Sequence, residues 1–168
     1  TTGETVRVLE KEGAVGFNQV VWDGKDSQGE IVLKGFYSIT IDANDDSGHS
    51  ASGNPGNVQV DYVHQINNLK CNPYRIIPVN GEISKITYDL TVDANMVVNI
   101  YDPNGYPFIT LLNNVFQTQG SHEFIWYGKE GDPNDPNSRC VSKEGDYIVR
   151  VKFVGMREKT EVTISVYK

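Results

Sequence analysis

Apolar side chains alternate with polar or small ones along most of this chain. The alternation is clear over residues 37–43, 86–92, 147–153 and 162–166. Successive side chains of a β-strand point to opposite faces, so this period predicts strands with one buried face. Turn-forming residues such as Asp-Pro-Asn-Gly at 102–105 separate the segments. Because no stretch longer than one turn shows helical spacing of apolar residues, the chain is predicted to be all-β, with the many short strands of a sandwich.

A ten-residue segment occurs twice in the chain. Residues 16–25 (GFNQVVWDGK) match residues 120–129 (GSHEFIWYGK) at a constant spacing of 104 positions. After a loop that is six residues longer in the second copy, a Gly-x-Tyr step follows at 35–37 and at 145–147. Each copy then continues into an alternating segment, a turn and a second alternating segment. The shared glycines, tryptophan and tyrosine indicate an internal duplication.

The two copies are not equally complete. The second copy is preceded by about fifty residues, with room for about four strands over 72–112, whereas the first is preceded by fifteen, with room for one strand over 4–9. The sequence therefore predicts a complete seven-stranded sandwich at 65–168. The first copy, residues 1–62, is predicted to be a partial module that holds only the C-terminal strands.

Half a sandwich exposes an apolar face and open strand edges. We consider three explanations for the partial first copy. Its missing strands lie upstream in a longer protein, which is the favoured one, or a partner chain donates them. In the third, the first copy forms a smaller sheet packed on the second.

The repeated aromatic residues are interpreted as parts of an interior. Trp22 and Trp126 are each expected to end a strand, followed by Asp-Gly or Tyr-Gly, and to pack the indole in the core. A ligand platform, as in sugar-binding modules, is the alternative. Tyr37 and Tyr147 come just after a glycine, like the corner tyrosines of sandwich folds, whose hydroxyl group bonds to backbone while the ring packs.

Residues of the first copy resemble a known family signature. The segment WDGKD at 22–26 and the positions after it resemble the Ig-like domain of the flagellar hook-capping (FlgD-type) protein family; those later positions are Gly29, Val32, Gly35 and Tyr37. The second copy adds the front half of the signature at 72–74, 86–90, 98–102 and 104–105. It departs where the signature has aspartate, at Tyr127, and in the longer loop at 132–137.

This resemblance implies a fold and a role. The implied fold is a pair of tandem Ig-like/fibronectin III-like β-sandwiches, the first represented by its C-terminal half. The implied role is that of a non-catalytic spacer, assembly module or sorting tail in an exported bacterial protein, at the cell surface or outside the cell. The resemblance concerns the type of domain and does not indicate a flagellar role.

The net charge and the N-terminal residues limit the kinds of partner that the chain is expected to bind. The chain has 22 acidic and 15 basic side chains, a formal charge of −7, which argues against a nucleic-acid or anionic-membrane partner. No run approaches the ~18 apolar residues of a membrane-spanning helix. The first residues, Thr-Thr-Gly-Glu, resemble neither a translation start nor a signal peptide. We therefore expect a processed product or a piece of a longer protein. Its expected partner is the upstream part of the same protein or another protein chain.

The sequence offers little for catalysis. Residues 48–53 (GHSASG) come nearest to a nucleophile elbow but lack the GxSxG pattern, and we interpret them as a flexible hairpin loop. Glycine-rich phosphate-binding motifs are not found. The chain is accordingly predicted not to be an enzyme and to carry no cofactor.

Two acidic loops are weak candidates for calcium binding. Calcium takes six to eight oxygen ligands, which dense Asp/Asn loops can supply, but neither loop has the EF-hand spacing. Aspartate is also common in turns because its side chain bonds to nearby backbone. We therefore predict no metal site and keep the loops as weak candidates, namely Asp42, Asp45 and Asp46 in one and Asp132 and Asp135 in the other.

The cysteines and histidines do not form a metal-binding pattern. Cys71 and Cys140 are 69 positions apart with no histidine nearby, which excludes a cysteine-type zinc site. A disulfide and two buried free thiols both remain open. The three histidines share no ligand spacing and are interpreted as incidental; they are His49, His64 and His122.

Aromatic residues in the second copy leave one alternative function. Rings that alternation places outward would stack on sugars in a carbohydrate-binding module, although cross-strand packing is the favoured interpretation. These rings belong to Tyr101, Tyr106, Phe108 and Tyr127. The alternative to a structural role is thus a carbohydrate- or calcium-binding module attached to a secreted hydrolase.

Overall fold

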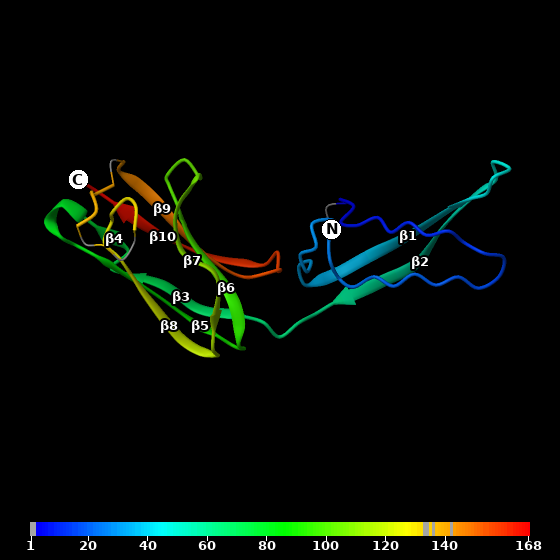
Figure 1. Cartoon of the computed structure of the whole chain (residues 1–168), viewed down its shortest axis with the longest axis horizontal. Coiled ribbons are helices and arrows are strands. Elements are labelled where there is room, and N and C mark those ends of the chain that lie inside the picture. Colours follow the sequence, from blue (N-terminus) through cyan, green and yellow to red (C-terminus); the bar gives the residue numbers. More distant parts are fainter. Residues whose placement is uncertain (1–2, 133–134, 136, 142) are drawn as a thin grey trace. The chain divides into compact units, whose positions relative to one another are not determined.

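A computed structural model describes residues 3–132, 135, 137–141 and 143–168. The chain divides into two units, Thr1–Tyr62 and Val63–Lys168. Strands are the main regular elements of both units, and the only helical element among the described residues is a short 3-10 turn, Pro78–Asn80 (Figure 1). The all-β prediction is therefore confirmed. We describe each unit by itself.

The second unit is a β-sandwich of two sheets. One sheet has the order β3-β5-β8 and the other β4-β10-β9-β6-β7. Neighbouring strands run antiparallel, except that β4 runs parallel to β10. The strands are β3 (Ile66–Asn72), β4 (Arg75–Ile76), β5 (Ser84–Leu90), β6 (Ala94–Tyr101), β7 (Pro107–Gln117), β8 (Gly120–Trp126), β9 (Gly145–Phe153) and β10 (Lys159–Val166).

The sequence predicts seven strands here, and the structure has eight. The difference arises at the beginning of the unit, where the chain leaves one sheet at Asn72 and joins the other at Arg75. One edge segment therefore counts as two strands, because each half bonds to a different sheet.

Alternate residues of both sheets point inward and form the core of the second unit. Trp126 at the end of β8 is fully buried, as its repeated position predicts. The inward residues of β5, β6 and β9 each expose 3% of their surface or less; they include Ile86, Tyr88, Leu90, Met96, Val98, Ile100, Tyr147, Val149, Val151 and Phe153. Burying each such side chain stabilises the fold by about 1.5–3 kcal/mol.

The first unit contains one antiparallel hairpin. Its strands are β1 (Gly35–Asn44) and β2 (Ser50–Val60), with a bulge on β2 where Ile39 and Ile41 face residues three apart. Up to this bulge the register matches that of the β9–β10 hairpin in the second unit. The matching pairs are Gly35↔Val60 with Gly145↔Val166, and Tyr37↔Val58 with Tyr147↔Ile164.

The strand predicted over residues 4–9 does not form, nor does one over 16–22 (Figure 1). At the 104-residue spacing, 4–9 corresponds to part of β7 and 16–22 to β8. In the second unit β7 pairs with β6 alone and β8 with β5 alone. Residues 3–62 contain no counterpart of β5 or β6, so both segments lack a strand to pair with. Residues 35–60 form strands because their two halves pair with each other.

The predicted hairpin loop over 48–53 is shorter than expected. A turn at Asp45–Gly48 connects the strands, and β2 begins at Ser50. Both serines of this stretch therefore lie in the β2 ladder, with Ser50 opposite Asn44 and Ser52 opposite Asp42.

Candidate functional site

The loop that follows the repeated tryptophan, Trp22 in the first unit and Trp126 in the second, has the same hydrogen bonds in both units. The indole nitrogen of Trp22 donates to the Lys25 carbonyl oxygen at 2.7 Å, and that of Trp126 donates to the Lys129 carbonyl oxygen at 3.3 Å. In each unit a buried valine then donates its backbone N–H to the loop glycine: Val32 to Gly24 at 3.0 Å, and Val141 to Gly128 at 2.9 Å. The loop thus closes through its own residues, whatever surrounds it.

The corner tyrosines also match. The Tyr37 hydroxyl donates to the Leu33 carbonyl oxygen at 2.7 Å, and the Tyr147 hydroxyl donates to the Lys143 carbonyl oxygen at 3.1 Å. Each ring packs against the tryptophan of its own copy, with ring centroids 5.4 Å apart in the first unit and 5.1 Å in the second. The prediction that these hydroxyls bond to backbone while the rings pack is confirmed.

The loop glycines share a conformation but differ in what covers them. Gly24 has a φ of 75° and Gly128 a φ of 61°, both in the left-handed region that favours glycine. A side-chain carbon added at Gly128 would lie 2.2 Å from Pro78, whereas one added at Gly24 would meet nothing within 4 Å. Pro78 lies between β4 and β5, the part that has no counterpart in residues 3–62. The first unit is therefore the same loop and hairpin without its cover.

The uncovered surface of the first unit is one side of its hairpin, which we call the hairpin face. It consists of Tyr37, Ile39 and Ile41 on β1 and Val58 and Val60 on β2. Ile39 is 39% exposed and Ile41 55%, whereas the corresponding side chains of β9 are fully buried, Val149 and Val151. Side chains built for a core thus lie in solvent, which marks this face as the candidate functional surface.

The strand edges of the hairpin are open as well. In the second unit β9 pairs with β6 on the side away from β10, and β10 pairs with β4 on the side away from β9. Among the described residues of the first unit, β1 and β2 pair with each other only. Unpaired backbone N–H and C=O groups along such edges form a template for further strands.

The acidic candidate Asp45 closes a turn. Its carboxylate accepts backbone N–H bonds from Ser47 and His49, both at 2.9 Å, and lies 2.8 Å from the His49 ring nitrogen. The contact with His49 lowers the pKa of Asp45 below its usual range. The same D-x-x-G-x pattern closes turns at 26–30 and 102–106, with equivalent carboxylate contacts. The repeated D-x-x-G-x spacing is therefore a sequence signal for turns of this kind.

The other acidic candidates do not close turns of this kind. Asp42 pairs with Ser52 within the β1–β2 ladder, and Asp46 is an exposed turn residue. The Asp135 carboxylate accepts the backbone N–H of Asn137 at 2.8 Å, and the Asp132 carbonyl oxygen accepts the backbone N–H of Asp135 at 3.2 Å. Residues 133, 134 and 136 of that loop lie outside the described residues. The described part of the chain contains no group of three or more metal-ligating side chains.

Asp102 shows the D-x-x-G-x turn in the second unit. Its carboxylate accepts the backbone N–H groups of Asn104 at 3.0 Å and Tyr106 at 2.9 Å, and lies 3.1 Å from the Lys143 ammonium group. The bond from Tyr106, together with Lys143, lowers the pKa of Asp102. This contact ties the β6–β7 turn to the segment ahead of β9.

The aromatic candidates of the second unit are covered to different extents. Arg150 lies over the Tyr101 ring at 4.1 Å, and Phe108 packs edge-on against Tyr147 at 5.5 Å. Tyr127 is half-buried, and Tyr106 is 69% exposed at the turn. Side chains of the same unit therefore engage two of the four rings, one of them through an arginine and the other through Tyr147 on a strand that is not paired with β7.

Both cysteines are free thiols, one of the two alternatives left open by the sequence. Cys71 on β3 is buried, and burial raises the pKa of its thiol to about 12. Cys140 is only half-buried, and its sulfur lies 3.4 Å from the Lys129 ammonium group.

The histidines make separate local contacts. His49 contacts Asp45, and His64 packs edge-on against Phe153 at a centroid distance of 5.3 Å. The His122 ring nitrogen lies 2.7 Å from the Thr118 carbonyl oxygen.

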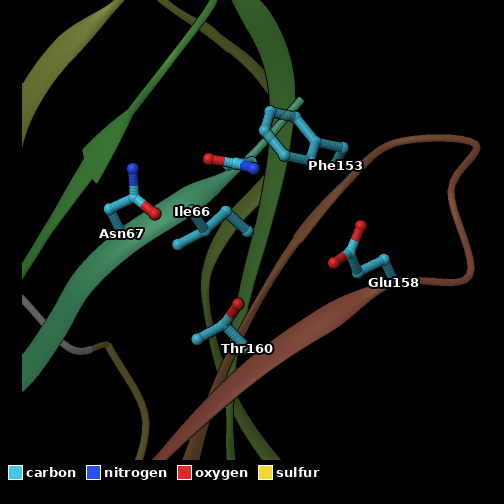
Figure 2. A pocket seen from close by; sticks show the side chains of 6 residues that line it. Ile66, Asn67, Phe153, Glu158 and Thr160 are labelled. Atoms are coloured by element: carbon cyan, nitrogen blue, oxygen red, sulfur yellow. The ribbon is translucent and has the colours of Figure 1, made fainter. Parts of the chain in front are cut away.

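A shallow hollow lies at one end of the second unit. Its volume is about 230 Å³, and strand β3 and the β9–β10 turn border it. Figure 2 shows its side chains, with Phe153 and Glu158 along the turn. The lining offers carboxamide, carboxylate and hydroxyl groups that can form hydrogen bonds; it comprises Gln65, Ile66, Asn67, Phe153, Glu158 and Thr160.

Comparison with known proteins adds no family assignment. No family model matches the chain, and a search of curated proteins finds no significant relative. Within the described residues, no helix has the length and apolar character needed to cross a membrane.

Proposed function

We propose that the chain is a non-catalytic structural region of a larger exported bacterial protein, located outside the cell or at its surface. In this proposal it works by assembling with other polypeptide segments through its Ig-like units. The observation that carries the proposal is the hairpin face, where Ile39 and Ile41 are exposed although their counterparts lie in a core. The resemblance of residues 22–37 to the FlgD-type Ig-like domain supports the same role.

The repeated aromatic residues support a structural role over ligand binding. Trp126 is fully buried, and Trp22 packs against Tyr37. Each indole nitrogen is bonded to its own loop, so it has no donor left for a ligand. These contacts support a role for both rings in stabilising the module.

The proposal is tested by the association of the whole chain. A double variant, Ile39→Lys/Ile41→Lys, places two charges on the hairpin face, where both side chains are already exposed. Its control, Ser38→Lys/Thr40→Lys, adds the same charge to the other side of the same strand. Sedimentation velocity over a range of concentrations should show association of the wild-type chain and of the control, and its loss in the face variant.

Two results would contradict this function. One is a wild-type chain that stays monomeric at every concentration, or variants that behave alike. The other is saturable retention on an insoluble polysaccharide, or a calcium-dependent rise in melting temperature, either of which would favour a binding module.

A further inference from the structure

The second unit shows what covers a hairpin of this kind. There, β9 and β10 correspond to β1 and β2, and the sheet β3-β5-β8 covers their inner face. β6 pairs with the edge of β9 that faces away from β10, and β4 pairs with the edge of β10 that faces away from β9. Residues 3–62 include counterparts of β7 to β10 but none of β3 to β6.

The exposed features of the first unit match this missing set of strands one by one. Residues 16–22 lack the partner that β5 provides to β8, and residues 4–9 lack the partner that β6 provides to β7. Gly24 is open where Pro78 covers Gly128, and Gly35 is open where Pro103 lies 3.0 Å from a carbon added at Gly145. A single segment of four strands would supply all of these contacts.

We propose that the hairpin face binds a polypeptide segment of four strands with the alternating pattern of β3–β6, joined to the chain ahead of Gly3. This inference deepens the proposed assembly role and rests on it. The point of entry follows from topology, because β6 runs into β7 through the turn at 102–106, and the β7 counterpart begins at residue 3. The segment adds strands to both edges of the hairpin and buries its apolar face.

A segment of this chain can serve as the four-stranded partner in a test of the proposal. Residues 63–106 contain β3 to β6 and the following turn. We would place a second copy of 63–106 directly ahead of Gly3 in the full chain, so that residues 3–62 receive a complete set of strands. The native second unit stays in place as an internal reference.

A matched control keeps the length and removes the core. In the added copy alone, Ile86→Lys, Val98→Lys and Ile100→Lys place charges at positions that are fully buried in the second unit. This extension has the same turns and the same backbone but cannot form an apolar interior.

Hydrogen exchange of residues 16–22 and 35–60 is the measurement. The unmodified extension should slow exchange in both segments at least about tenfold relative to the original chain, and the control extension should not. Slower exchange at 16–22 is the result specific to this proposal, because this segment gains a strand partner only if the β5 counterpart in the extension pairs with it. Unchanged exchange at 16–22, or equal effects of both extensions, would overturn the inference.

This result is independent of the test of the proposed function. If the wild-type chain associates through its hairpin face but the extension does not slow exchange, the assembly role stands and its partner is of another kind. Conversely, polysaccharide retention would contradict the assembly role without changing exchange in the extended chain.

Discussion

The loop before β1 and the loop before β9 are built alike, yet the strands around them differ. Both loops have the indole-to-carbonyl bond, the left-handed glycine and the tyrosine corner. Residues 120–126 form β8, while their counterparts 16–22 form no strand. The loops and the strands therefore depend on different interactions. Short-range hydrogen bonds fix the loop from its own sequence, whereas a strand forms only beside a partner, because its backbone groups bond to another strand.

The largest expected difference between the units is at the two tryptophans. Trp126→Ala should destabilise the second unit by about 3–5 kcal/mol, because it empties a fully buried site. Trp22→Ala should cost clearly less, because its half-buried indole has no second sheet above it. Urea denaturation followed by far-UV circular dichroism measures both changes. Equal losses of stability would mean that Trp22 also lies in a closed core.

The loop glycines give a second, smaller contrast. Alanine at either Gly24 or Gly128 should cost about 1–2 kcal/mol for the left-handed backbone. Gly128→Ala should cost about 1–3 kcal/mol more, because its new carbon would overlap Pro78. Thermal unfolding of the two variants checks the order. If Gly24→Ala lowers stability as much as Gly128→Ala does, another segment must pack on Gly24 as Pro78 packs on Gly128.

The smallest effect concerns the D-x-x-G-x turns in acid. Asp102 has a lowered pKa, so its stabilisation is present above the ordinary aspartate value of about 3.9 and is lost as pH falls through its folded-state pKa. Asp102→Asn should therefore lower the melting temperature of the second unit at pH 7 and weaken its decline below pH 4. Asp45→Asn, in the equivalent turn of the first unit, should leave that transition unchanged. If Asp45→Asn lowered the melting temperature of the second unit as much as Asp102→Asn does, the two units would not unfold independently, contrary to this prediction.

The sequence predicts most of the second unit because local and long-range signals agree there. Alternation over 147–153 indicates a strand, and β6 and β10 are present to pair with it. The prediction fails over 4–9, where the length ahead of the first copy leaves room for a strand but the strand has no partner. Patterning reports which side chains suit a strand, but not whether the neighbouring strand exists.

The candidate surface was only partly foreseeable. The unequal lengths ahead of the two copies predict an uncovered half-module, and the hairpin face fits that expectation. In the acidic loop at 42–46, Asp45 closes a turn, where it accepts hydrogen bonds from Ser47 and His49. Its D-x-x-G-x spacing, compared with the turn at 102–106, is the signal that would have identified it.

Native-state hydrogen exchange of the unmodified chain tests most directly whether the first unit is an uncovered half of the second. If it is, backbone amides of β1 and β2 should exchange on the order of a hundredfold faster than those of β9 and β10, since an isolated hairpin is marginally stable while a sandwich opens as a unit. Equal protection of the two hairpins in the monomeric chain would contradict the account.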